Sequence, residues 1–201
     1  MKSHALALAG LALALAALAG CASNAPEERF YTLSAVATAD APVARAAYSV
    51  SVGPVSVPEA VDRPQLVLRR APNRVEILEQ ARWAAPLPSG IAQVVAANLT
   101  HLLGGARVAA YPQSAVADPD YRVAVDVQRF ESAPGAAASL DALWTIRSAK
   151  GALVRAGRST IDEPARGGDT EALVAAHDRA LAALSRDIAR ALPAARPAAL
   201  P

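Results

Sequence analysis

The amino-acid sequence predicts a single α/β domain in which a mixed, partly antiparallel sheet is covered by two main helices. Six or seven segments alternate apolar and polar residues with the period of a half-buried strand, and two others repeat apolar residues at helical spacing. Three of the strand-like segments follow one another through short connections, which favours an antiparallel meander. The chain of 201 residues suits one domain after an N-terminal leader.

The leader, residues 1–20, has the pattern of an export signal. Lys2 supplies a positive charge, and residues 5–18 contain no charged or strongly polar side chain. An uncleaved membrane anchor is the alternative. However, the 18 uncharged residues from Ala5 to Ala22 are at the short edge of the roughly 20 that a spanning helix needs. Alanine, which inserts weakly, makes up half of them, so a cleaved signal is favoured.

The segment Leu18-Ala19-Gly20-Cys21 is similar, at all four positions, to the lipobox of bacterial lipoproteins. In that chemistry the cysteine sulfur receives a diacylglyceryl group, and the new amino terminus receives an N-acyl chain such as palmitate. Cleavage after Ala17-Leu18-Ala19 would instead release a protein without lipid. Cys21 is the only cysteine, so no internal disulfide competes for it. We therefore predict lipid attachment at Cys21, where two or three chains anchor a protein without a spanning helix.

The charge balance gives no sign of a nucleic-acid partner. Loss of Lys2 with the leader leaves 19 cationic side chains against 18 carboxylates, a net charge of +1. The sequence has no basic run, and aromatic residues make up only 4% of it. The high pI therefore reflects arginine content rather than a strong positive field.

Composition divides the remaining chain into three parts. Residues 21–47 are small, polar or alanine-rich apart from the apolar group Phe30–Leu33, which predicts a lipidated N-terminus and a flexible tether. Residues 48–192 carry the periodic patterns and are the predicted domain. Residues 193–201 are rich in alanine and proline and are predicted to be a disordered tail.

The first half of the domain predicts two strands, a hairpin and a helix. Residues 48–57 alternate, with a bend at Gly53-Pro54. Residues 65–70 and 74–80 flank the turn Ala71-Pro72-Asn73 and form the hairpin. Residues 86–103 repeat apolar side chains at helical spacing until Gly104-Gly105 stops the helix. A short strand is expected at 106–111.

The second half predicts the meander and a final helix. Residues 120–132 alternate until the phase slips to turn Phe130 inward, which indicates a bulge. Residues 139–151 and 152–163 continue the meander around Ala149-Lys150-Gly151. The last helix starts near Asp169, which can cap it. Its apolar stripe comprises Leu173, His177, Leu181, Leu184, Ile188 and Leu192, and its polar face comprises Glu171, Asp178, Arg179, Arg186 and Arg190.

The sequence offers little catalytic chemistry. His177 interrupts an apolar stripe, which favours a hydrogen-bonded core residue over a base or ligand, and His101 lies near the end of its helix. No His, Cys, Asp or Glu has the spacing of a metal site, and no phosphate-binding or nucleophile motif occurs. We expect no metal, no cofactor beyond the covalent lipid, and no enzymatic activity.

The two tryptophans receive different interpretations. Trp83 precedes a proline-started helix, where it either fixes the start of the helix by packing or forms an exposed anchor for a partner. Trp144 lies inside an alternating strand and is expected in the core.

Four segments in order resemble one family: LAGCAS (18–23), FYTLS (30–34), ARWAAPLPSGIAQVVAANLTHLLG (81–104) and YRVAVDVQRFES (121–132). They resemble the ABC-type transport auxiliary lipoproteins, in particular the PqiC/YmbA-like branch. The resemblance implies a three-layer α/β sandwich with a mixed sheet, like an anticodon-binding domain. Its most specific side chains outside the strand at 121–132 are Arg82, Trp83, Pro86 and Leu87, which we interpret as a partner-binding segment.

The same resemblance implies a periplasm-facing lipoprotein of a lipid-transport system that supports outer-membrane integrity. Its implied partners are a mammalian-cell-entry (MCE) domain protein that bridges the two membranes and an inner-membrane component or ABC transporter. Homo-oligomeric rings occur among such relatives. Ala22 stands where an aspartate is associated with inner-membrane retention, which favours the outer membrane and leaves inner-membrane anchoring as the alternative.

Three functions remain open from the sequence. The first is a docking subunit that receives the end of an MCE assembly. The second is a carrier that holds a lipid in its own pocket, and the third is an envelope hydrolase with a site assembled from distant residues.

Overall fold

The computed structural model describes residues 27–39, 46–104, 106–112 and 118–193. The expected signal residues Leu18, Ala19 and Gly20, the lipid site Cys21 and nearly all of the expected tail lie outside these ranges. The elements in chain order are β1 (Arg29–Tyr31), β2 (Ser49–Ser56), β3 (Gln65–Ala71), β4 (Arg74–Trp83), α2 (Leu87–Leu102), β5 (Arg107–Ala110), β6 (Tyr121–Ala133), β7 (Ala137–Ser148), β8 (Leu153–Pro164) and α3 (Thr170–Ala191).

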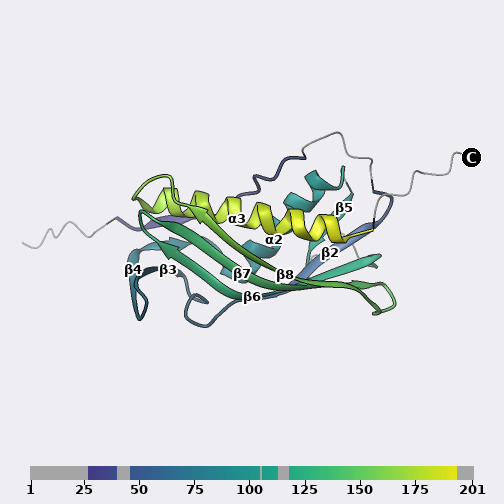
Figure 1. Cartoon of the computed structure of the whole chain (residues 1–201), viewed down its shortest axis with the longest axis horizontal. Helices are drawn as coiled ribbons and strands as arrows, with labels where there is room; N and C mark the ends of the chain where they lie inside the picture. Colours follow the sequence, from purple (N-terminus) through teal and green to yellow (C-terminus); the bar gives the residue numbers. More distant parts are fainter. Residues whose placement is uncertain (1–26, 40–45, 105, 113–117, 194–201) are drawn as a thin grey trace, which may run out of the picture.

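The long strand β6 organises an eight-stranded mixed sheet (Figure 1). One side of β6 pairs with β7 along its whole length, and β8 continues this antiparallel meander. The other side pairs in parallel with β2 through residues 121–126, and with β3 only at Leu68–Ser132. Beyond β2 lies β5, and beyond β3 lie β4 and β1. The sheet therefore branches into two groups of strands at opposite ends of β6.

The predicted hairpin and bulge are both confirmed. β3 and β4 pair antiparallel around the turn after Ala71. The β6–β7 register shifts between Val127 and Arg129, and the shift turns Phe130 into the core, where it is 3% exposed. The middle strand of the meander, expected from residue 139, begins earlier, because Ala137 and Ala138 already belong to β7.

The single domain with a mixed sheet and two covering helices is confirmed, with both helices on one face of the sheet. They contact each other, and the buried Asn98 Nδ2 of α2 lies 3.3 Å from Ser185 Oγ of α3. α2 packs on β2 and β5, whereas α3 packs on β7 and β8. The described residues thus form two layers rather than the expected three, and the other face of the sheet is open.

The long helix α3 follows from its sequence pattern. Asp169 caps its N-terminus by accepting a hydrogen bond from the Ala172 amide at 2.8 Å. The predicted apolar stripe is buried, with Leu181 and Leu184 at 0% exposure. One prediction is wrong: Asp178, assigned to the polar face, is buried at 8% exposure because an N-terminal segment of the chain covers it.

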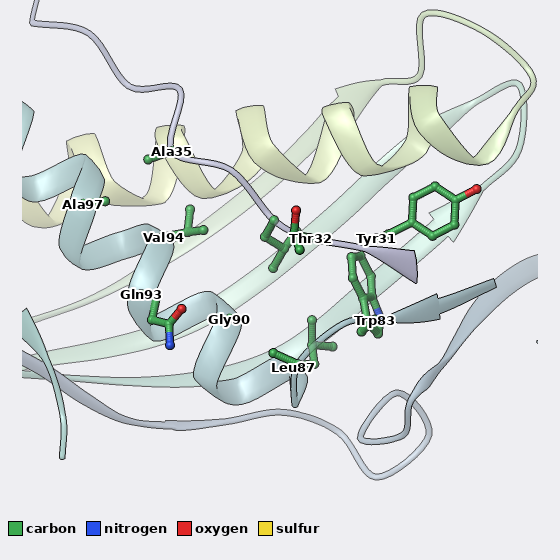
Figure 2. A pocket seen from close by; sticks show the side chains of 11 residues that line it. Tyr31, Thr32, Ala35, Trp83, Leu87, Gly90, Gln93, Val94 and Ala97 are labelled. Carbon is green, nitrogen blue, oxygen red and sulfur yellow. The ribbon is translucent and has the colours of Figure 1, made fainter. Parts of the chain in front are cut away.

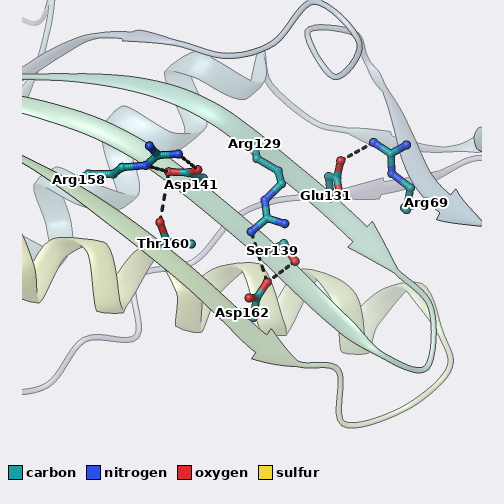
Figure 3. A network of polar contacts seen from close by, with 8 residues as sticks. All are labelled: Arg69, Arg129, Glu131, Ser139, Asp141, Arg158, Thr160 and Asp162. Carbon is teal, nitrogen blue, oxygen red and sulfur yellow. Dashed lines mark hydrogen bonds and ion pairs between the residues drawn. The ribbon is translucent and has the colours of Figure 1, made fainter. Parts of the chain in front are cut away.

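The open face of the sheet carries polar pairs between its strands (Figure 3). Arg158 donates to both carboxylate oxygens of Asp141, at 2.8 and 2.5 Å. Arg129 pairs with Asp162 at 3.7 Å, and Arg69 pairs with Glu131. Cross-strand pairs of opposite charge suit a solvent-facing sheet surface.

Residues 27–39 correct the boundary expected at Tyr48. β1 pairs in parallel with β4 through Phe30–Arg82 and its neighbours, and Ala37 is buried at 4% exposure. This part of the expected tether therefore belongs to the folded body. A three-residue edge strand with two exposed side chains and a half-buried Tyr31 leaves almost no periodic pattern, which is why the sequence did not predict it.

Candidate functional site

The connection between β4 and α2 holds the four side chains that the sequence singled out. The Trp83 amide donates to the Pro64 carbonyl at 2.7 Å, and the Ala84 amide donates to the Tyr31 carbonyl at 2.8 Å. Pro86 then forms the N-cap of α2, which has no side-chain cap. Backbone bonds to two separate segments therefore fix the end of the strand before the helix begins.

Two of these four side chains are buried and two are accessible. Trp83 is 8% exposed and meets Phe130 edge to face, with ring centroids 6.2 Å apart, and Leu87 is 3% exposed. Arg82 pairs with Glu28 at 3.1 Å and Pro86 is exposed. The structure therefore places Trp83 in the core, and the alternative of an exposed aromatic anchor is wrong.

An apolar groove of about 260 Å³ opens beside these residues (Figure 2). One wall is the segment 31–35 and the other is the first half of α2, with Trp83 at the end. We call it the α2 groove. Its lining residues are Tyr31, Thr32, Leu33, Ala35, Trp83, Ala85, Leu87, Gly90, Gln93, Val94 and Ala97.

A second cavity of about 320 Å³ lies on the other side of the same connection. Trp83, Ala85 and Leu87 line both cavities, so the connection forms the ridge between them. The second cavity adds Arg63, whose Nε is buried and has no hydrogen-bond partner within the described part of the chain. A cavity therefore lies on each side of the segment 82–87, which the sequence singled out.

The outer wall of the α2 groove is a strap, residues 31–37, that polar side chains of both helices hold. The Ser34 amide donates to Asp178 Oδ1 at 2.8 Å, and the Ala37 amide donates to Asn98 Oδ1 at 2.9 Å. Tyr31 donates to Glu171 at 3.1 Å. Burial raises the pKa of Asp178 above its ordinary value, while the Ser34 amide and Arg179 act in the opposite direction. The composition of residues 21–47 predicted a tether here rather than a strap. The signals for the strap were the apolar group Phe30–Leu33, which overlaps its start, and the family-like segment FYTLS.

His177 and Ser132 form a buried pair at 2.8 Å between Ser132 Oγ and His177 Nε2. His177 stacks on Phe130 and is 1% exposed, and burial lowers its pKa to about 3. Among the described residues its Nδ1 has no hydrogen-bond partner. A Ser–His catalytic pair needs an orienting acid on that nitrogen and access for substrate. The expectation of a hydrogen-bonded core histidine is therefore confirmed.

Within the described ranges, no group of three or more His, Cys, Asp or Glu side chains could hold a metal ion. Neither helix described there combines the length and apolar character that crossing a bilayer requires.

Comparison with known proteins supplies the family. Residues 31–189 match the family model described as the ABC-type transport auxiliary lipoprotein component. No curated protein matches the chain.

Two crystal structures share the fold. A Xanthomonas campestris protein of the family called DUF330 has a TM-score of 0.67 and 22% identity, over 80% of this chain and 92% of its own. An uncharacterised protein has a TM-score of 0.67 and 21% identity, over 82% of this chain and 97% of its own. The family model covers well over half of the sequence, starting in the strap and ending in α3. The chain therefore belongs to the family of ABC-type transport auxiliary lipoprotein components.

Proposed function

We propose that this protein is a non-catalytic docking subunit of an MCE-type lipid-transport system in the bacterial envelope. Lipid on Cys21 holds it at the outer membrane, and the folded body faces the periplasm. The family supports an auxiliary role in transport, and the lipobox-like segment 18–21 supports the anchor. The observation that carries the docking role is the apolar α2 groove beside Trp83 and Leu87.

The groove has the features of a site for an apolar protein segment. It is open along the helix, and the side chains at its base, Leu87 and Val94, are buried and preorganised. Gly90 keeps its centre clear, and the exposed Gln93 offers an amide at its rim. An apolar centre with a polar rim is the usual anatomy of a protein interface. We propose that the end of the MCE-domain protein binds here.

The volume of the groove favours docking over lipid carriage. Pockets for drug-sized ligands measure about 300–1,000 Å³, and a membrane lipid is larger than such ligands. The α2 groove, at about 260 Å³, falls below that range. It accommodates a few side chains of a partner rather than a whole lipid.

A variant that fills the groove tests this function. Trp83→Ala is unsuitable, because removing a buried aromatic costs about 3–5 kcal/mol of stability. A Cβ at Gly90 would meet only Leu33 Cδ1, at an ordinary 3.7 Å, so the side chain of Gly90→Leu starts in free space and extends into the groove. It also raises helix propensity. Ser89→Leu adds the same side chain one residue away, at an exposed position, and is the matched control.

The expected result is that Gly90→Leu loses co-purification of the MCE-domain protein, whereas Ser89→Leu keeps it. Both variants should melt at or above the wild-type temperature. Equal capture by the two variants would contradict the α2 groove as the docking site.

A further inference from the structure

We propose that the tip of the β7–β8 hairpin, residues 147–155, binds the surface of a bilayer that contains anionic phospholipid. The stretch from residue 142 to residue 161 contains no aspartate or glutamate. It contains four cationic side chains, of which Arg147, Lys150 and Arg155 lie in the tip and are exposed. Lys150 is the only lysine after Lys2.

Arg122 of β6 adds a fourth cation to the three that lie in the tip. Arg122 and Arg147 are directly opposite each other on antiparallel strands. Arg122 Nη1 lies 3.4 Å from the Ala149 carbonyl oxygen, and Arg147 Nη1 lies 2.9 Å from that of Gly151. The two guanidinium groups therefore gather at the turn that carries Lys150. Like charges placed opposite each other in this way destabilise a sheet unless an anion neutralises them.

No carboxylate of the described residues forms an ion pair with these four cations. The other arginines of the open face pair with Glu131, Asp141 and Asp162 (Figure 3), but Arg122, Arg147, Lys150 and Arg155 form no ion pair there. Asp120 precedes Arg122, but its carboxylate accepts hydrogen bonds from the Ser49 amide and hydroxyl, both at 2.8 Å. The cations of the tip are therefore available to bind an external anion such as a phosphate group.

Exposed apolar side chains beside the cations favour a lipid headgroup over a free phosphate. Leu153 is 57% exposed and Val154 is 39% exposed, between Lys150 and Arg155. A dissolved phosphate would gain nothing from them. At a bilayer surface, apolar side chains enter the boundary of the acyl region while cations contact the phosphates.

The tip lies at the opposite end of the sheet from the N-terminal strand (Figure 1). Tyr121 pairs with Ser148 at the tip end of β6, whereas β3, which leads to β4 and β1, meets β6 at Ser132. The 12 residues of β8 separate these ends by about 40 Å. The tip and the strand β1 that follows the proposed anchor therefore lie at opposite ends of the folded body.

Vesicle flotation of the full chain carrying Cys21→Ser tests the proposal. This chain accepts no lipid on residue 21, so the outcome is independent of the proposed anchor. Vesicles of phosphatidylcholine alone measure any binding by the leader, and vesicles with added phosphatidylglycerol measure the anionic contribution. Arg147→Ser/Lys150→Ser removes two tip charges. Arg74→Ser/Arg166→Ser removes two exposed charges at the other end and is the matched control.

We expect stronger binding to the vesicles with phosphatidylglycerol, and a loss of that binding as salt rises. The tip variant should bind them roughly thirty-fold more weakly, and the control should bind as the parent does. Leu153→Ser should also weaken binding. Equal binding to both vesicle types, or equal binding by the tip and control variants, would overturn the proposal. An unchanged Leu153→Ser would overturn the bilayer contact in favour of a soluble acidic ligand.

Discussion

The indole of Trp144 in β7 lies against the backbone of Gly157, its partner residue in β8. A Cβ at position 157 would lie only 2.2 Å from Trp144 Cζ2. The indole Nε1 donates to Ser159 Oγ at 3.1 Å, and Ser159 donates to Asp187 of α3 at 2.6 Å. The side chain that a strand would ordinarily place at 157 is absent because the tryptophan ring occupies its space.

The variant Gly157→Ala should therefore destabilise the protein. The new methyl group forces either the ring or strand β8 to move, and such overpacking costs about 1–3 kcal/mol. Urea unfolding followed by tryptophan fluorescence measures this difference. Ala156→Ser, at the adjacent exposed position, is the control and should unfold as the wild type does. Equal midpoints for the two variants would show that the ring does not need the space at Gly157.

The strap should depend on the acceptor oxygen of Asp178 rather than on its charge. Asp178→Asn keeps an oxygen for the Ser34 amide and removes the cost of burying a carboxylate, whereas Asp178→Ala removes the acceptor. Hydrogen exchange of the Ser34 amide should accelerate roughly ten-fold in the alanine variant and stay near wild type in the asparagine variant.

The cap residue Asp169 supplies a matched control for this experiment. Asp169→Ala removes an aspartate from the same helix and weakens its N-terminus, but Asp169 does not contact the strap amide. Exchange at Ser34 should therefore be unchanged. Acceleration in Asp178→Asn equal to that in Asp178→Ala would mean that the negative charge itself holds the strap.

Burial of neutral His177 should make stability depend on pH. In the folded protein the pKa of His177 is about 3, below the ordinary value of 6.5. Between these two pH values the imidazole is protonated in the unfolded chain and neutral in the folded chain. The contribution of His177 is fully present above about pH 6.5 and is lost as pH falls, by up to about 1.4 kcal/mol per pH unit.

The variant His177→Gln isolates this effect, because glutamine presents a polar group toward Ser132 but does not titrate in this range. Chemical unfolding at a series of pH values between about 4.5 and 7.5 should give a flatter stability profile for the variant. Parallel profiles for wild type and variant would show that His177 does not contribute to acid sensitivity.

The elements that the sequence predicted well are those with long, one-sided apolar patterns. The stripe of α3 and the alternation of β6, including the slip at Phe130, specify both the element and its buried face. The turn between Ala71 and Arg74 likewise specified its hairpin. In each case a local pattern is sufficient because burial on one face repeats along the element.

The sequence could not predict features that depend on contacts between distant segments. The strap buries little apolar surface, and its position comes from hydrogen bonds across 144 residues to Asp178 and 61 residues to Asn98. The burial of Trp83 depends on Phe130. The branching of the sheet depends on which strands meet β6, and alternation alone does not encode partners. The sequence therefore did not predict the α2 groove, although the family resemblance singled out Trp83 and Leu87, which line it.

Site-specific photo-crosslinking in cells tests whether the MCE-domain protein docks in the α2 groove. A photoreactive residue replaces Gln93, which is exposed at the groove. In a second strain it replaces Gln128, which is exposed on β6, and this position is the control. We expect a crosslink to the MCE-domain protein from position 93 and none from position 128. A crosslink from position 128 alone, or none from position 93, would contradict docking in the α2 groove.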